Sequence, residues 1–241
     1  MSLVNFNMIA TFAPLQPQTG KHAARAIYGC NIQLKKRFKP MPTITLIIGS
    51  TNKGKIQEFR DFFKGICETM PQPESVEVDE TGDTFAANAR LKAEAVALAT
   101  GQWALADDSG LSVDALGGAP GVHSARYAAT DAARIERLLQ ELNAAGAHEP
   151  SSCSARFTAA LALADPSGQV VLAVEGHCPG QILTESRGDG GFGYDPVFYV
   201  PEAQLTFAEM PKALKAKLGH RGRAFAALKP QLQALLAQDR Q

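Results

Sequence analysis

The first residues that could bind a ligand or take part in catalysis form a short polar stretch, STNKGK, at positions 50–55. The stretch follows an apolar run, and backbone N–H groups at such a turn, together with a lysine, make a binding site for an anion such as phosphate. Gly49, Gly54 and Lys55 match the spacing of a P-loop. The position where a P-loop needs Ser or Thr to hold magnesium is Ile56. Three interpretations stay open: a damaged nucleotide-binding loop, a chance match on a plain capped turn, and a different phosphate-binding device.

A second group of candidate residues is acidic. Asp107 and Asp108 are adjacent in ADDSG, at the end of a predicted buried strand. Two adjacent carboxylates repel each other there unless a cation lies beside them. Glu80, just before a predicted helix, could complete an oxygen-rich site of the kind that Mg²⁺ prefers. The alternative is that DDSG is only a turn in a loop.

A glycine-rich motif, GGFGYDP, occupies residues 190–196. Its glycines permit close approach of the backbone to a ligand. The rings of Phe192 and Tyr194 either stack on a nucleobase or pack into the core, and Asp195 adds one acceptor.

A basic motif, KALKAKLGHRG, follows at residues 212–222 and places Lys215, His220 and Arg221 near a helix break. A solvated helix face is the simpler interpretation of its lysines. The His-Arg pair lies between two glycines, which expose it for binding.

The elements that must position these motifs are strands and helices in mixed order. The apolar run at 43–49 predicts a buried strand, and apolar residues at helical spacing predict a helix at 55–66. Residues 154–165 and 169–178 flank the turn sequence DPSG and predict an antiparallel hairpin. The sequence also predicts an exposed strand at 75–80, helices at 83–101 and 131–146, a strand at 102–107 that enters a long loop, an aromatic strand within 191–200, and a helical tail at 212–238 with a break at Gly219 to Gly222. This order indicates an α/β domain with a mixed sheet.

Composition narrows the class of protein. The 241 residues carry 24 basic and 24 acidic side chains, but residues 1–40 hold six of the basic and none of the acidic ones, so the remainder has a charge of -6. This acidic body argues against nucleic-acid binding. The apolar runs are too short to span a membrane. The four cysteines form no C-x-x-C pair and indicate reduced thiols in a cytoplasmic protein. Residues 1–40 are interpreted as an extension, disordered or upstream of the true start, and residues 41–241 as one domain.

Five motifs, in order and spacing, resemble the inosine/xanthosine triphosphate pyrophosphatase family: STNKGK, ETGDTFAANARLKA, ADDSGLSVDALGGAPGVHSARY, GGFGYDPVF and GHRGRA. The resemblance covers about residues 43–236. These enzymes hydrolyse non-standard purine nucleoside triphosphates to the monophosphate and pyrophosphate. The resemblance implies the same reaction on ITP, dITP and XTP, Mg²⁺ as cofactor, a homodimer, and a long mixed twisted sheet flanked by helices, with two lobes and a central cleft.

The resemblance also implies a role for each motif. Asp108 is expected to be the catalytic base and, with Glu80 and Asp107, a magnesium ligand. Ile56 is then no defect, because the metal is held elsewhere. The implied substrate-binding residues are Ser50, Thr51, Asn52, Lys53, Gly54, Lys55, Ser109, Phe192, Gly193, Tyr194, Asp195, Lys215, His220 and Arg221.

Two alternatives stay open. One is another magnesium-dependent phosphohydrolase, which cleaves a different phosphate bond or a pyrimidine nucleotide. The other is a nucleotide-binding module without catalysis, for which ITP binding would survive Asp108→Asn.

Overall fold

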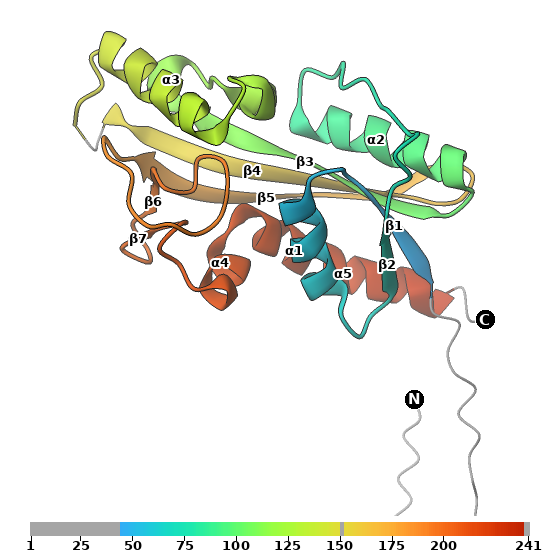
Figure 1. The fold of residues 1–241 in the computed structure, drawn as a ribbon. Coiled ribbons are helices and arrows are strands. Elements are labelled where there is room, and N and C mark those ends of the chain that lie inside the picture. The colour runs from blue at the N-terminus through green and yellow to red at the C-terminus, as the bar shows by residue number, and fades with distance from the viewer. Residues whose placement is uncertain (1–43, 150–151, 239–241) are drawn as a thin grey trace, which may run out of the picture. The chain divides into compact units, whose positions relative to one another are not determined.

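The computed structural model describes residues 44–149 and 152–238, so the extension predicted for residues 1–40 lies outside the described residues. The described chain is built on one seven-stranded sheet in the order β2-β1-β3-β4-β5-β6-β7 (Figure 1). β1 runs parallel to β2 and β3, and every later pair is antiparallel, which confirms the predicted mixed sheet. The strands are β1 (Thr45–Gly49), β2 (Glu68–Pro71), β3 (Trp103–Val113), β4 (Ser154–Ala164), β5 (Val170–Ile182), β6 (Phe198–Val200) and β7 (Leu205–Thr206).

The helices begin and end at the signals that the sequence carries. In α2, Thr84 accepts a hydrogen bond from the N–H of Ala87, and Gly101 ends the helix in the left-handed conformation with φ 62°. Thr130 caps α3 in the same way. The predicted break in the tail is confirmed at Gly219, which separates two helices. The α-helices are α1 (Lys53–Phe63), α2 (Phe85–Thr100), α3 (Asp131–Ala144), α4 (Lys212–Leu218) and α5 (His220–Gln238).

The long strands β3, β4 and β5 form the centre of the sheet. The hairpin of β4 and β5 was expected, and Asp165 closes its turn by accepting a hydrogen bond of 2.8 Å from the N–H of Ser167. The prediction that a loop follows Asp107 is wrong. β3 continues to Val113 because its residues stay paired with β4 as far as Ala155. The ADDSG motif therefore lies in the middle of a strand.

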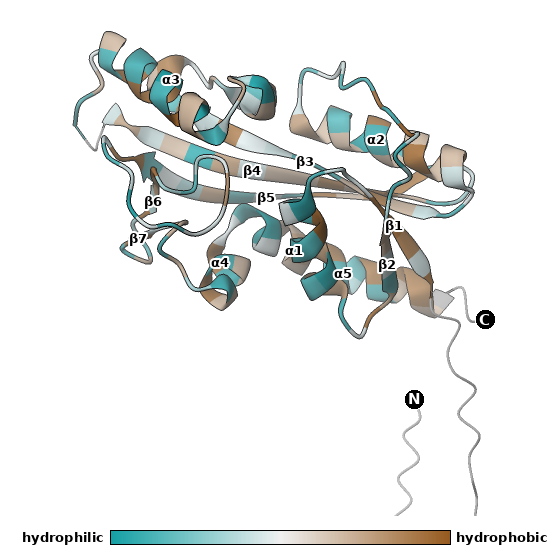
Figure 2. Ribbon diagram, in the orientation of Figure 1, coloured by the Kyte–Doolittle hydropathy of each residue, from teal (hydrophilic) through white to brown (hydrophobic). Residues whose placement is uncertain are grey.

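Helices cover both faces of the sheet at the β1 end. Alanines of α2, such as Ala93 and Ala97, pack on Ala104 and Ala106 of β3. On the opposite face, Phe59 and Phe63 of α1 pack with α5 against the other side of the same strands. Figures 1 and 2 show α2 above the sheet, α1 and α5 below it, and apolar residues concentrated on β1. The alternation of side chains along β3 thus serves two different cores.

A third core lies toward the other end of the long strands. Leu111 and Val113 of β3 contact Leu138 and Leu142 of α3, together with aromatic residues of the β6 region. The three strands β3, β4 and β5 run through all of these cores. The result is two lobes that share one sheet.

The edge of the sheet differs from the prediction. A strand was expected at 75–80, but residues 72–84 are irregular and the edge strand is β2. Backbone groups in this segment bond locally: the N–H of Val76 donates to Pro73, and its carbonyl accepts from the Gln72 side chain. The alternating pattern instead reflects Val76 and Val78, which are half-buried without a strand partner. Across the described ranges, no helix combines the length and apolar character needed to cross a membrane.

Candidate active site

The STNKGK stretch connects β1 to α1 and is arranged as a helix N-terminus. Asn52 is the N-cap, and its Oδ1 accepts a hydrogen bond of 3.1 Å from the N–H of Lys55. The helix begins at Lys53, two residues earlier than predicted, so Gly54 lies in its first turn. No acidic residue occupies that turn. The free N–H groups and the helix dipole therefore favour an anion here.

Lys55 points from this turn to Asp107, which is buried at 1% exposure. Its Nζ lies 2.6 Å from Asp107 Oδ2, and Nε of Arg221 lies 3.5 Å from the same oxygen. Burial alone would raise the pKa of Asp107, but the charges of Lys55 and Arg221 outweigh it and hold that pKa well below its ordinary value. Asp107 is therefore ionised and holds the side chains of Lys55 and Arg221 together.

Asp108 faces a different set of partners on α2. Its Oδ1 lies 3.0 Å from Lys92 Nζ, and its Oδ2 accepts a hydrogen bond of 3.2 Å from Asn88. The same Lys92 Nζ lies 2.7 Å from Glu80 Oε1. Burial raises the pKa of Asp108 despite the opposing charges of Lys92 and Lys55. A carboxylate with a raised pKa is a stronger base than an ordinary one.

The edge of β3 is open beside these carboxylates. β1 pairs with β3 only as far as Ala106. Farther along this edge, the N–H groups of Leu111 and Val113 bond to Ser124 Oγ and the Ala119 carbonyl. By strand alternation the N–H groups of Asp107 and Ser109 point to the same side. They lie on the edge of β3 between the last residue paired with β1, Ala106, and the contact of Leu111 with Ser124.

Residues 190–195 contact the STNKGK stretch through Phe192 and Gly54. We call residues 190–195 the substrate loop and residues 50–55 the phosphate turn, after the roles predicted for them from the sequence. Asp195 is buried, and its Oδ2 accepts from the N–H of Phe192 at 2.8 Å and pairs with Lys215 Nζ at 2.6 Å. Phe192 is half-buried and touches Gly54: a Cβ added to Gly54 would lie 2.9 Å from its Cε1. Tyr194 is buried in the core and donates to the Ser124 carbonyl at 3.0 Å. The structure thus separates the two rings: Tyr194 is buried and bonded to Ser124, whereas Phe192 is half-buried beside Gly54.

The His-Arg pair begins α5 and is buried, contrary to the expected exposure. His220 is buried and its ring packs against those of Phe157 and Phe207, with centroids 4.7 and 5.9 Å away. Burial, together with the charge of Arg221, lowers the pKa of His220 well below its ordinary value, so the imidazole is neutral. Its Nδ1 has no hydrogen-bond partner among the described residues.

Arg221 joins the two halves of the site. Besides Asp107, its guanidinium donates to Ser109 Oγ at 2.7 Å and to Glu58 Oε2 at 3.1 Å. Its Cζ lies 5.5 Å from the centre of the Phe192 ring. A planar cation with partners on α1 and β3 fixes the geometry of the cleft floor.

Two adjoining cavities, of about 500 and 380 Å³, open on either side of Phe192. The larger holds the phosphate turn, and the smaller is enclosed by α1 and α4. The predicted substrate residues Ser50 and Thr51 line neither cavity, and the same is true of the three predicted metal ligands. The other predicted substrate residues line one or both: Asn52, Lys53, Gly54, Lys55, Ser109, Phe192, Gly193, Tyr194, Asp195, Lys215, His220 and Arg221.

The donor set for a metal can be tested against the predicted ligands. Within the described ranges, no three His, Cys, Asp or Glu side chains are grouped to hold a metal ion. Glu80 and Asp108 nevertheless reach one common cation, Lys92 Nζ, and so fit a divalent ion that two carboxylates would hold. Asp107 is occupied by Lys55 on one oxygen, while its Oδ1 has no partner among the residues described.

Sequence reasoning missed three residues of the site: Asn88, Lys92 and Glu58. Asn88 and Lys92 are four residues apart on α2, so they share one helix face with Thr84. Asn88 is fully buried in an alanine-rich helix. A polar pair at a core-facing helical spacing was the available signal.

Comparison with known proteins assigns the family. The family model described as the Ham1 family matches residues 46–231. The chain belongs to the Ham1 family. This confirms the resemblance inferred from the five motifs, since curated relatives of this Ham1 chain carry the name dITP/XTP pyrophosphatase. The relative from Synechococcus sp. (strain CC9311) is 57% identical over 83% of this chain and 95% of its own, and that from Parasynechococcus marenigrum (strain WH8102) is 58% identical over 81% and 98%.

Solved structures agree with the fold. A HAM1 protein from Coxiella burnetii is 41% identical, with a TM-score of 0.72 over 80% of this chain and 100% of that one. The Staphylococcus aureus Ham1 protein is 37% identical, with a TM-score of 0.69 over 79% and 98%. The α/β architecture expected from the sequence is therefore the architecture of this family.

Proposed function

We propose that this Ham1-family chain hydrolyses non-standard purine nucleoside triphosphates, namely ITP, dITP and XTP, to the monophosphate and pyrophosphate. The relatives named dITP/XTP pyrophosphatase support this activity. The observation that carries the proposal for the site is the convergence of a helix N-terminus, a buried lysine and an aromatic loop on one cleft. A triphosphate needs the first two, and a purine ring needs the third.

The triphosphate is assigned to the phosphate turn. The first-turn N–H groups of α1 and the side chains of Lys53 and Lys55 supply positive charge from one side. The N–H groups of Asp107 and Ser109 supply donors from the open strand edge. The remaining predicted residues of this turn, Ser50, Thr51 and Asn52, shape it, and Asn52 does so as the helix cap.

Asp108 is assigned as the general base. Its pKa is raised by burial, and Lys92 and Asn88 fix its carboxylate by one hydrogen bond to each oxygen. In the proposed reaction, Asp108 accepts the proton of a water that attacks the α-phosphorus, and pyrophosphate leaves in line. Glu80 and Asp108 would hold Mg²⁺, whereas the carboxylate of Asp107, the third predicted ligand, faces the other side of β3 and pairs with Lys55. When bound, the ion would neutralise charge on the pyrophosphate leaving group.

The purine is assigned to the smaller cavity beside Phe192. This ring offers a stacking face, and Lys215 Nζ lies 5.1 Å from its centre. A keto group at position 6 needs a hydrogen-bond donor, which Arg221 or a backbone N–H supplies. An adenine amine would leave that donor unpaired, and such mismatches can reduce kcat/KM by about 10⁴-fold.

The proposal extends to the domain bounds, the oligomeric state and the compartment. Residues 41–241 are proposed as the enzyme domain, which acts as a cytoplasmic homodimer without nucleic-acid or membrane partners. The free thiols of Cys67, Cys153 and Cys178 support a reducing compartment. Light scattering of the purified protein tests the dimer, for which a mass twice that of the 25.6 kDa chain is expected.

The test is pyrophosphate release from ITP, XTP, GTP and ATP with Mg²⁺. Asp108→Asn is compared with Asp79→Asn, which changes an exposed carboxylate in the loop that carries Glu80. ITP and XTP should be cleaved far faster than ATP and GTP, and Asp108→Asn should lose about 10²- to 10⁴-fold in kcat while Asp79→Asn keeps it. Release of orthophosphate would instead identify a different phosphohydrolase. Tight ITP binding without cleavage would identify a binding module.

A further inference from the structure

We propose that Asp131 is a positioning residue that holds the substrate loop in register over the nucleotide. Asp131 begins α3 and lies outside all five sequence motifs. The inference rests on the proposed function, because it concerns how the same cleft binds its nucleotide. It assigns to α3 a task that its packing against β3 does not explain.

The carboxylate of Asp131 is divided between two partners. Its Oδ2 accepts a hydrogen bond of 2.7 Å from the backbone N–H of Gly193. Its Oδ1 pairs with Arg134, one helical turn along α3, and Arg134 in turn donates to the Ala128 carbonyl. Thr130 already caps the helix through the N–H of Ala133. Asp131 is therefore not needed as the cap, and its orientation is fixed toward the loop.

The loop requires such an anchor because its backbone is otherwise permissive. Gly191 and Gly193 have φ of 78° and 64°, in the left-handed region that glycine enters at little cost. Inside the loop, Phe192 N–H and Asp195 bond to each other. Two N–H groups point out of the loop: that of Gly190 donates to the Ala208 carbonyl at 3.2 Å, and that of Gly193 donates to Asp131 at 2.7 Å. The charged acceptor gives the stronger hydrogen bond of the two.

A second tie from the neighbouring residue acts in the same direction. Tyr194 Oη donates to the Ser124 carbonyl, in the segment that leads to α3. Two consecutive loop residues are thus bound to residues 124–131. Asp131, Tyr194 and Gly193 also line the larger cavity together.

The geometry that depends on this anchor is the position of Phe192. Its ring touches Gly54 of the phosphate turn and stands between the two cavities. Rotation of the Gly193 peptide would move the ring away from this contact. The loop would then lose its stacking face for the base without any change at Asp108.

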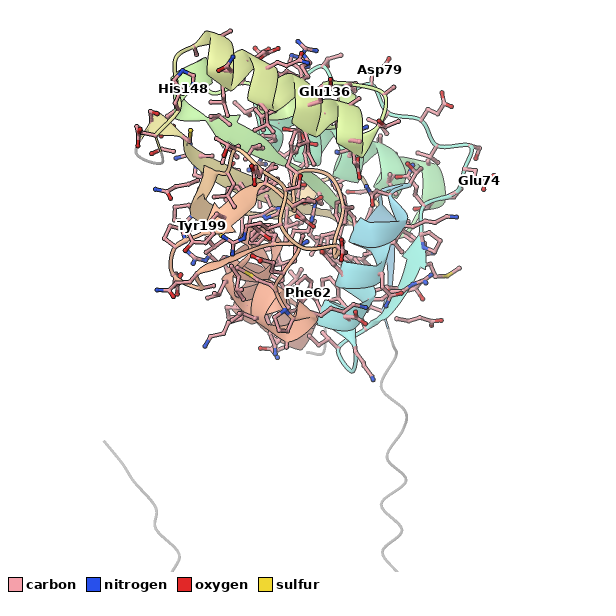
Figure 3. The ribbon with its side chains drawn as sticks, turned by 60° about the vertical axis from the view of Figure 1, so that its left-hand side comes forward. Phe62, Glu74, Asp79, Glu136, His148 and Tyr199 are labelled. Carbon is pink, nitrogen blue, oxygen red and sulfur yellow. The ribbon has the colours of Figure 1, made fainter. Side chains whose placement is uncertain are left out.

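The test compares Asp131→Ala with Asp131→Asn, which keeps an acceptor oxygen. Because the anchor acts on binding, Asp131→Ala should raise KM for ITP about tenfold with kcat within about twofold, and Asp131→Asn should restore most of the loss. Glu136→Ala, an exposed position on α3 visible in Figure 3, and Thr130→Ala, which weakens the helix start alone, should leave KM unchanged.

Hydrogen exchange at the Gly193 amide gives a readout independent of catalysis. Exchange should be faster in Asp131→Ala than in wild type, Glu136→Ala or Thr130→Ala. Unchanged KM and unchanged exchange in Asp131→Ala would overturn the inference, as would an equal rise of KM in Thr130→Ala. If the wild-type protein cleaves no triphosphate, the proposed function has failed, and the exchange rate alone still decides whether Asp131 holds the loop.

Discussion

Asp107 and Asp108 are consecutive residues of β3, yet their carboxylates face opposite sides of the strand. Asp107 meets Lys55 and Arg221, whereas Asp108 meets Asn88 and Lys92. The first set of partners holds its carboxylate ionised, and the second leaves a carboxylate whose pKa is raised. Because side chains alternate along a strand, two adjacent aspartates have different partners and oppositely shifted pKa values.

This difference predicts opposite effects on stability. Asp107→Asn removes a carboxylate whose pKa is lowered in the folded protein. The contribution of this carboxylate to stability is fully present above the unfolded pKa of about 3.9, and it is lost as the pH falls through the folded pKa. The substitution should cost roughly 3 kcal/mol at pH 7, because Lys55 is left buried without its partner. Asp108→Asn removes a charge that burial disfavours, so the free energy of unfolding should stay level or rise.

Urea unfolding of both variants at pH 7 measures the difference, with Asp79→Asn as the exposed control. The same preparations report turnover, which Asp108→Asn should lose while remaining folded. Equal losses of stability in Asp107→Asn and Asp108→Asn would contradict the assignment of separate roles.

The second prediction concerns Glu80 and the metal. Glu80 and Asp108 share Lys92, so Glu80→Gln leaves a single carboxylate at the position proposed for Mg²⁺. The Mg²⁺ concentration for half-maximal activity should rise about tenfold or more, while activity at saturating Mg²⁺ falls less. A magnesium titration of pyrophosphate release checks this. A requirement for Mg²⁺ identical to that of Asp79→Asn would remove Glu80 from the metal site.

Much of this site could be predicted because its chemistry lies in contiguous motifs. Asn52, Lys55 and Gly54 follow a strand and open a helix, and that local pattern carries its own geometry. The caps Thr84 and Gly101 were likewise local signals. Helix starts and ends of this kind depend on residues that are close together in the sequence.

What the sequence did not predict depends on contacts between distant elements. Lys92 joins Glu80 and Asp108 only because α2 packs against β3, and Glu58 meets Arg221 across 163 positions. The full length of β3 was missed for the same reason, since pairing with β4 overrides the turn-forming character of DDSG. Tertiary contacts also decided that Tyr194 is buried and bonded to Ser124 while Phe192 stays half-buried at the boundary of both cavities.

The third prediction uses the contact between Gly54 and Phe192. A Cβ at Gly54 would lie 2.9 Å from Phe192 Cε1, so Gly54→Ala must displace the ring or the loop that carries it. The backbone should gain up to about 1 kcal/mol, because alanine favours the first turn of α1 over glycine. We expect a higher KM for ITP with unchanged or higher thermal stability. The control is Ala86→Gly, which exchanges alanine for glycine near the start of α2. Gly65→Ala is unsuitable as a control because Gly65 has a φ of 79°, where an alanine would be strained.

The kinetic and thermal measurements separate two outcomes for Gly54→Ala. A raised KM at intact stability places Phe192 at the substrate. A fall in stability with no change of KM would mean that the contact serves packing alone.

The last prediction concerns acid stability and His220. The imidazole is buried against the rings of Phe157 and Phe207, and its folded pKa lies well below the ordinary value of 6.5. Below pH 6.5 the His220 imidazole is protonated in the unfolded chain but stays neutral in the folded chain. The free energy of unfolding therefore falls as the pH falls, until the folded pKa is reached. The slope is about 1.4 kcal/mol per pH unit, which gives roughly 2 kcal/mol between pH 7 and pH 5. His220→Phe removes this proton while keeping a ring in the stack.

Urea unfolding at pH 7 and pH 5 measures the slope for each protein. The wild type should lose about 2 kcal/mol more than His220→Phe over this range, whatever the absolute stability of the variant at pH 7. His148→Gln, which replaces an exposed histidine (Figure 3), is the control for the loss of an imidazole elsewhere in the chain. Equal slopes for wild type and His220→Phe would show that the folded imidazole takes up a proton between pH 7 and pH 5 as readily as the unfolded one, which would contradict its lowered pKa. The assignment of a neutral imidazole to the cleft floor would then be wrong. A protonated His220 would be a third cation beside Lys215 and Arg221, whose charges disfavour it.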